Sequence, residues 1–277
     1  MRADGKRVKN NVDNMYTIVP YFMVDRNDAC NAITVRIPYK PIHDYMIKKR
    51  KEGVHLSTLS IITAALVRTI DEHPFVNRFV VNRKIYAHNE ILIAMVVMRS
   101  EGDQTSMGKM KFEPEDTIFE VNQKINDYVT ANRHEDANKT DKIMGILVKM
   151  PFLLRIITGF LKWADKHGLL PKAVLDMSPF HASIVVTNLA SIRTNHIHHH
   201  VYNFGTIGSI YALGNLEDIP KMVNGEIVLE RQIPIGVMCD ERLGDGHAYA
   251  RAFATFSKYA KNPELLEKPP EKIVRDF

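Results

Sequence analysis

The feature that most restricts the fold is an apolar run near the C-terminus, followed by a polar turn and a helical pattern. The apolar run, 233–239, has the character of a buried strand, and 248–260 has that of a helix. Between them stands Asp240-Glu241-Arg242-Leu243-Gly244-Asp245-Gly246. A sharp Asp-Gly turn between a buried strand and a helix holds a side chain rigidly, as a catalytic group requires. We therefore place the candidate active site at this turn.

The rest of the chain alternates between helical and strand patterns. Within 57–73, apolar residues recur at three- and four-residue spacing and Pro74 stops the helix. Asn82-Arg83 separates two short β-rich runs and predicts a hairpin. The expected helices are 41–52, 57–73, 115–132, 143–170 and 248–260. The expected strands are 32–37, 79–81, 84–86, 91–98, 183–187, 209–213, 226–234 and 235–239.

This order of elements predicts an α+β fold in two layers, a large mixed sheet with helices packed on one side. The sequence shows no internal repeat and no low-complexity linker, so we expect one domain over 1–277. Within it, 1–27 is expected to be an irregular arm with one extended piece at 16–23. Residues 143–178 are expected to form an apolar helical insertion.

Composition excludes several classes of protein. The net charge of +5 over 277 residues is modest and unclustered, so we expect no nucleic-acid partner. No apolar run is long enough to span a membrane, and the polar N-terminus lacks a signal peptide. The only cysteines, Cys30 and Cys239, are far apart and lack metal or redox spacing. These features favour a cytoplasmic location.

Several short motifs resemble one family in the same order. The turn keeps Asp245-Gly246, the end of a His-x-x-x-Asp-Gly signature, and Val186-Thr187-Asn188-Leu189 resembles a Ser-Asn-Leu-Gly segment. The stretch 56–77 resembles a helix that ends in a Pro and an Asn before a hairpin, and Asn262-Pro263-Glu264-Leu265-Leu266 resembles the closing tail. The chain thus resembles the CoA-dependent acyltransferases: chloramphenicol acetyltransferase and the acyltransferase cores of the 2-oxoacid dehydrogenase complexes.

The resemblance implies a chloramphenicol acetyltransferase-like fold and a homotrimer with the active site in a channel between subunits. It implies acyl-CoA and a small-molecule acceptor as partners, with the coenzyme A thioester as co-substrate and no bound cofactor. Thr187 corresponds to the hydroxyl that donates to the oxyanion, and Asn188 and Gly246 are the expected cofactor-binding residues. No lipoyl or subunit-binding domain is recognisable, so we expect a free-standing relative.

The same resemblance assigns Asp245 a structural ion pair that orders the turn, and Arg26 and Arg242 are its candidate partners. Glu241 stands where the family has its catalytic histidine. A glutamate side chain in water has a pKa of about 4.3 and is a weak base at neutral pH unless its surroundings change it.

Three hypotheses follow for the chemistry. Glu241 is the base; or the base is a histidine, with His199, His200 or His247 as candidates; or catalysis is lost and the protein serves binding or assembly.

Two segments have competing interpretations. The histidines of Asn195-His196-Ile197-His198-His199-His200 alternate as metal ligands do on a strand, but no carboxylate or cysteine stands at matching spacing, so we assign no metal. The segment 145–163 carries three charges, all cationic. Packing into the core or a trimer interface is the commoner explanation for such a segment. A lid over an acyl substrate, or contact with a membrane surface, is the less favoured alternative.

Overall fold

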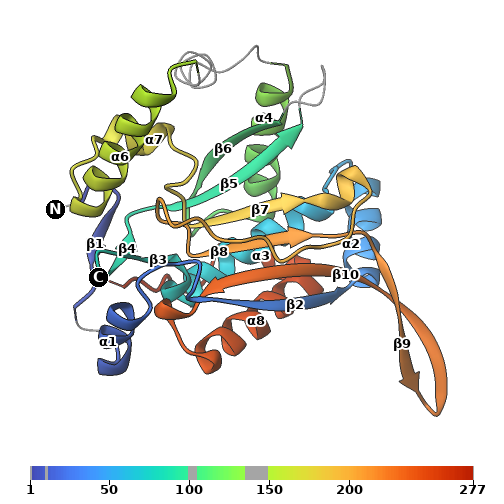
Figure 1. The fold of residues 1–277 in the computed structure, drawn as a ribbon. Helices are drawn as coiled ribbons and strands as arrows, with labels where there is room; N and C mark the ends of the chain where they lie inside the picture. Colours follow the sequence, from blue (N-terminus) through green and yellow to red (C-terminus); the bar gives the residue numbers. More distant parts are fainter. Residues whose placement is uncertain (1, 10–11, 99–104, 135–148, 277) are drawn as a thin grey trace.

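The computed structural model describes residues 2–9, 12–98, 105–134 and 149–276 (Figure 1). Two sheets form the framework. The large sheet has seven strands in the order β2-β10-β8-β7-β5-β6, with β9 paired to β10 outside this path. Its strands are β2 (Cys30–Pro38), β5 (Ile91–Met98), β6 (Thr105–Phe112), β7 (Ile184–Asn188), β8 (Ser209–Leu213), β9 (Glu217–Val223) and β10 (Glu226–Asp240). A small sheet joins β1 (Gly5–Arg7), β4 (Lys84–His88) and β3 (Arg78–Val81).

The large sheet is mixed, which confirms the expected fold class. β7 runs parallel to both of its neighbours, β5 and β8, whereas β10 runs antiparallel to β2, β8 and β9. The predicted runs 226–234 and 235–239 form one continuous strand, β10. Pro234 is tolerated there because pairing with β9 ends at Gln232 and pairing with β8 begins at Ile235.

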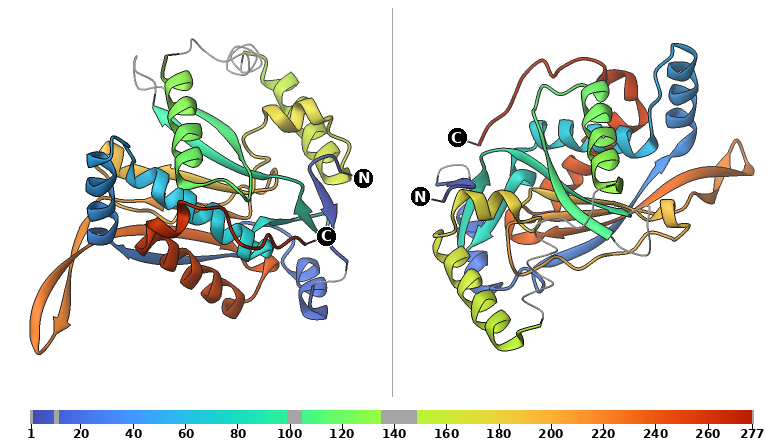
Figure 2. Two further views of the ribbon diagram at one scale, coloured as in Figure 1. Left: turned by 180° about the vertical axis from the view of Figure 1, so that it is seen from behind. Right: turned by 90° about the horizontal axis from the view of Figure 1, so that it is seen from above.

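Helices cover one face of the large sheet, as predicted (Figure 1 and Figure 2). They are α2 (Tyr39–Lys51), α3 (Thr58–Glu72), α4 (Ile118–His134) and α8 (Gly246–Lys261). The central helix, α3, is buried over nearly its whole length, and its start is capped by Ser57, whose hydroxyl accepts from the Ser60 amide. Apolar side chains of all four helices join the sheet in one core cluster. This packing fixes the helix that follows the candidate turn against the sheet.

The N-terminal segment differs from the sequence-based expectation. The piece 16–23 was expected to be extended, but Asn14–Phe22 forms a helix, α1. Asp13 explains its start, because the Asp13 carboxylate accepts a hydrogen bond from the Met15 amide. Gly5–Arg7 forms β1 on the edge of the small sheet, so the arm is not mostly irregular. The prediction also missed β6 and β9, whose many polar side chains hide the strand pattern.

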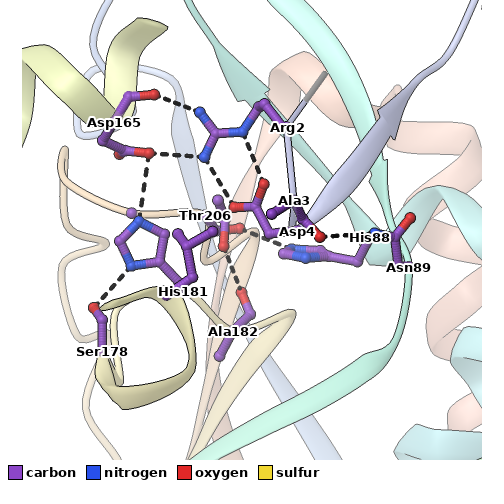
Figure 3. Close-up of polar contacts among 12 residues, drawn as sticks. Arg2, Ala3, Asp4, His88, Asn89, Asp165, Ser178, His181, Ala182 and Thr206 are labelled. Carbon is purple, nitrogen blue, oxygen red and sulfur yellow. Dashed lines mark hydrogen bonds and ion pairs between the residues drawn. The ribbon is translucent and has the colours of Figure 1, made fainter. Parts of the chain in front are cut away.

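The structure describes only part of the apolar segment 143–178. Part of the predicted helix 143–170 lies outside the described residues. Within them, α6 (Pro151–His167) begins with a proline and α7 (Lys172–Met177) follows. One side of α6 is anchored to the N-terminal residues (Figure 3). Asp165 accepts from Arg2, Nη2 to Oδ1 being 2.7 Å, and Arg2 also binds Asp4. No helix among the described residues has the length and apolar character needed to cross a membrane.

Candidate active site

The candidate turn is a single 3₁₀ turn, Glu241–Leu243, between the end of β10 and the start of α8. Glu241 is half-buried and its backbone amide donates to the Ala29 carbonyl at 2.8 Å. Its carboxylate accepts a hydrogen bond from the Asn31 side chain, with Nδ2 3.0 Å from Oε2. Within the described part of the chain, Glu241 forms no ion pair. The carboxylate is therefore held in one position while remaining accessible to a reacting group.

Asp240, rather than Asp245, carries the ion pairs of this turn. The Asp240 carboxylate is fully buried and accepts three bonds from Arg242: from the backbone amide at 3.1 Å, from Nε at 2.8 Å and from Nη2 at 2.7 Å. Arg26 Nε lies 3.6 Å from the same carboxylate. Arg26 also donates to the carbonyls of Tyr202 and Gly205. The cluster ties the end of β10 to the segment after α1.

The expected ion pair of Asp245 with Arg26 or Arg242 is therefore wrong. Both arginines face Asp240, because that carboxylate is buried and stands directly at the strand end. Asp245 is exposed and caps α8, its Oδ1 accepting from the Ala248 amide at 2.6 Å. A carboxylate at this position also interacts favourably with the helix dipole. Asp245 thus orders the turn as a helix cap.

Thr187 and Asn188 form the end of β7, and both are half-buried. Among the described residues, the Thr187 hydroxyl has no hydrogen-bond partner. The Asn188 carbonyl accepts from the Ser191 hydroxyl at 2.6 Å. Thr187 therefore has a donor free for a ligand, as an oxyanion donor would need.

The strand register separates Thr187 from Glu241 within one chain. Thr187 pairs with Ala212, and Ala212 pairs with Gly236 on β10. Gly236 precedes Glu241 by five residues, so about 17 Å along the strand direction separates Thr187 from Glu241. In addition, β8 lies between β7 and β10 in the sheet. One small substrate cannot touch both side chains of the same chain.

The histidine segment, residues 195–200, crosses the face of the large sheet that the helices do not cover. It lies above the row of paired residues that contains Gly236. Thr34, which pairs with Gly236, has its hydroxyl 3.3 Å from His196 Nε2 and 3.2 Å from His198 Nε2. His199 and His200 stack on each other, with ring centroids 4.5 Å apart. Within the described ranges, no group of three or more His, Cys, Asp or Glu residues is arranged to hold a metal ion.

Two more of the predicted site residues, His247 and Gly246, lie near the turn. His247 is the second residue of α8 and is exposed. Gly246 is also exposed, and a Cβ placed there would meet nothing within 4 Å. The local backbone therefore does not demand glycine at this position.

Sequence reasoning missed two neighbours of the turn. Asn31 holds the Glu241 carboxylate from β2, a contact that only strand pairing brings about. Tyr16 of α1 packs against the apolar cluster that contains Leu243, and its pKa is raised by burial and by the charges of Asp245, Glu241 and Asp13. The unexpected helix α1 is what brings Tyr16 to the turn. No local sequence signal connects either residue with Glu241.

A cavity of about 580 Å³ adjoins the turn at Arg242. Arg26 and Arg83 also line it, and so do Lys162 and Lys166 of α6. Its acidic lining residues are Asp25 and Asp165, and the second is already bound to Arg2. Arg26 and Arg242 are paired with Asp240, so the surplus of positive charge in the cavity comes from Arg83, Lys162 and Lys166.

Comparison with known proteins agrees with the resemblance in the sequence. Residues 176–267 match the family model described as 2-oxoacid dehydrogenases acyltransferase (catalytic domain). The matched segment contains Thr187, the histidine segment and the candidate turn. A comparison with curated proteins found no match.

Solved structures of the same fold cover nearly the whole chain. A probable dihydrolipoamide acetyltransferase from Listeria monocytogenes 4b F2365 has a TM-score of 0.59 at 15% identity, covering 96% of this chain and 98% of its own. The cubic core of the pyruvate dehydrogenase multienzyme complex has a TM-score of 0.60 at 10% identity, covering 91% and 88%. A chloramphenicol acetyltransferase has a TM-score of 0.57 at 10% identity, covering 92% and 99%. The chain therefore has the chloramphenicol acetyltransferase-like fold and, over residues 176–267, the sequence pattern of the 2-oxoacid dehydrogenase acyltransferase catalytic domain, a match that supports acyl transfer in general.

Proposed function

We propose that the protein transfers an acyl group from a coenzyme A thioester to a thiol, hydroxyl or amine acceptor, as a single-domain homotrimer. The observation that carries this proposal is the placement of Glu241. Its carboxylate stands at the end of a buried strand, held by Asn31 and free of ion pairs within the described residues. The resemblance in the sequence assigns Glu241 to the histidine position of the family signature.

The proposed reaction uses two groups of the protein. Glu241 takes the proton of the acceptor, and the acceptor atom attacks the thioester carbonyl carbon. The Thr187 hydroxyl donates to the oxyanion that forms. When this intermediate collapses, the carbon–sulfur bond breaks, and the coenzyme A sulfur receives the proton from Glu241. No other reactant is required.

The separation of Thr187 and Glu241 supports a site shared between subunits. Because they lie about 17 Å apart along the strand direction, a site containing both draws Thr187 from one chain and Glu241 from its neighbour. Such a head-to-tail contact closes into a ring when the rotation permits, and a trimer is such a ring. The cationic cavity beside Arg242 supports binding of the phosphates of coenzyme A.

The first test is turnover with acetyl-CoA and a panel of small thiols, alcohols and amines, followed by release of the free coenzyme A thiol. The Glu241→Gln variant keeps the shape and hydrogen bonding of the side chain but cannot accept the proton, so we expect turnover to fall by about 100-fold or more. Unchanged turnover would remove Glu241 from the base role and leave His199, His200 and His247 to be tested singly.

A mixing experiment tests the shared site. Glu241→Gln and Thr187→Ala chains, each expected to lose most of its turnover alone, are co-refolded in equal amounts. If each site draws one group from each neighbour, about a quarter of the sites recover both groups, and activity returns to that fraction. No recovery in mixed trimers would contradict a site shared between subunits.

Gly246 gives a test of the bound co-substrate. Because a Cβ fits there without contact, Gly246→Ala is expected to fold normally, and a loss of coenzyme A affinity in titration calorimetry would report a ligand close to this position. The alternative function is a catalytically inactive binding or assembly protein. Binding of acetyl-CoA without turnover, unchanged by Glu241→His, favours that alternative.

A further inference from the structure

We propose that α6 binds the surface of an anionic lipid membrane through its outward face. Four large apolar side chains lie on that face at helical spacing, and all are exposed: Phe152 (79%), Ile156 (52%), Phe160 (61%) and Trp163 (51%). Trp163 stacks on Phe160, with ring centroids 5.9 Å apart, so the aromatic side chains form one surface. Exposed apolar residues grouped in this way mark an interaction site.

The other side of α6 is fixed to the body of the protein, which forces the apolar stripe outward. Ala164 and Asp165 are buried, and Leu161 packs against the cluster formed with α7. Figure 3 shows Asp165 between Arg2 and His181, with His181 Nε2 3.4 Å from Asp165 Oδ1. Rotating the stripe inward would break the buried ion pair of Asp165 with Arg2. The exposure of the stripe is therefore built into the fold.

The charges beside the apolar stripe indicate that its binding partner is anionic. Lys149, Arg155, Lys162 and Lys166 are all exposed beside the apolar stripe. Asp165 is the only acidic residue from 149 to 170, and it is buried. An amphipathic helix with aromatic residues on one face and cations on the flank matches an anionic bilayer, which offers both an apolar interior and negative headgroups.

The position of α6 also suits a flat surface. Figure 1 and both views of Figure 2 show α6 at an outer edge of the molecule, at the opposite end from the β9–β10 hairpin. A second copy of the chain is a poorer match, because the chain itself has a net charge of +5. The membrane role does not depend on the proposed acyl transfer.

The experiment is co-sedimentation of the full chain with vesicles of phosphatidylcholine alone, or with about one-third phosphatidylglycerol, at low salt and at about 0.5 M salt. Trp163 is the only tryptophan, so its fluorescence reports contact directly. We expect binding to the anionic vesicles at low salt, a blue shift of the emission, and weaker binding at high salt.

Two variants dissect the interaction. Phe152→Ser with Phe160→Ser removes apolar surface but keeps Trp163, and we expect loss of binding and of the blue shift. Lys149→Glu with Arg155→Glu reverses two charges that do not line the cationic cavity, and we expect at least about tenfold weaker binding. The matched control is Ile227→Ser with Leu229→Ser on the exposed β9–β10 hairpin, which should bind like the wild type. Unchanged thermal unfolding shows that each variant is folded.

Two results would overturn the proposal. One is absence of binding to anionic vesicles at low salt. If the Phe152→Ser, Phe160→Ser variant then forms a smaller oligomer in light scattering, the stripe is an interface between copies instead. The other is equal binding to neutral and anionic vesicles that the charge variant leaves unchanged.

Discussion

The guanidinium of Arg242 lies 2.7 Å from the carboxylate of Asp240, two residues earlier in the chain, and its remaining hydrogen bonds go to the carbonyls of Met23 and Val24. This arrangement leaves Glu241 without the ion pair that its sequence neighbour could have formed. The buried ion pair of Arg242 with Asp240 therefore holds the turn in place. The accessible carboxylate of Glu241 beside it pairs with no cation in the described ranges.

Removing the Asp240 carboxylate should destabilise the protein strongly. In Asp240→Ala, Arg26 and Arg242 keep their charge in a buried place without a counter-ion, which costs about 3–5 kcal/mol. Denaturant unfolding measures the change. Asp218→Ala breaks the exposed ion pair with Arg231 and is the control, with an expected loss below about 1 kcal/mol. Equal losses in the two variants would contradict the buried role of Asp240.

Asp245 should act as a helix cap and not through an ion pair. Asp245→Ala removes the acceptor for the Ala248 amide and should cost about 1 kcal/mol of unfolding free energy. Asp245→Asn and Asp245→Ser keep an acceptor without the charge and should recover most of that loss. If Asn and Ala were equally harmful in thermal unfolding, the charge and not the cap would be what matters.

His88 should make the protein less stable in mild acid. Burial lowers the pKa of His88 to about 4, although the Asp4 charge and the Thr206 carbonyl oppose the shift. As the pH falls from about 6.5 to 4, the unfolded chain takes up the proton first, so up to about 3 kcal/mol of stability is lost in that window. His88→Leu should flatten this part of the curve of unfolding free energy against pH. The same replacement at the exposed His55 is the control variant.

Asp165 should contribute stability that disappears in stronger acid. Burial raises its pKa, but hydrogen bonds from His181 and Arg2, together with their charges, outweigh burial and bring the pKa to about 2. Because the folded pKa lies below the unfolded value, the stability is present above about pH 4 and is lost as the pH falls towards 2. Asp165→Asn should lose about 2 kcal/mol at neutral pH and show a shallower acid slope. The exposed Asp176→Asn serves as the control, and a matching effect there would argue against the buried network.

Gly236 should be needed to seat the histidine segment. A Cβ at this position would overlap the Ile197 carbonyl, which crosses directly above β10. Gly236→Ala should therefore cost about 1–3 kcal/mol as the segment moves off the sheet. Hydrogen exchange over residues 195–200 measures that displacement. Unchanged protection there would show that the segment tolerates the methyl group in place.

Much of the fold followed from local patterns, because those patterns record burial. The apolar repeat of α3 and the apolar run of β5 were predicted within one or two residues. The hairpin at Asn82-Arg83 was also predicted, and both residues adopt the positive φ angles that such a turn requires. By contrast, β9 is paired on one side only and carries polar side chains, so its sequence lacks a strand pattern.

The candidate site was predictable only in part. The position of the turn and the identity of Glu241 were readable, since both are local. The partners of the turn come from distant parts of the chain: Asn31 from β2, Arg26 from the segment after α1, and Tyr16 from α1. Which of two carboxylates attracts an arginine depends on burial, and burial is decided by tertiary packing. That is why Asp245 was assigned an ion pair that belongs to Asp240.

The register that sets Thr187 level with Gly236 has a consequence for how activity depends on concentration. On the proposed mechanism, a single folded chain carries two half-sites, one at each end of the central strands. On the proposed mechanism, diluting the protein until the subunits separate abolishes turnover while every chain remains folded. Specific activity then becomes a direct measure of assembly.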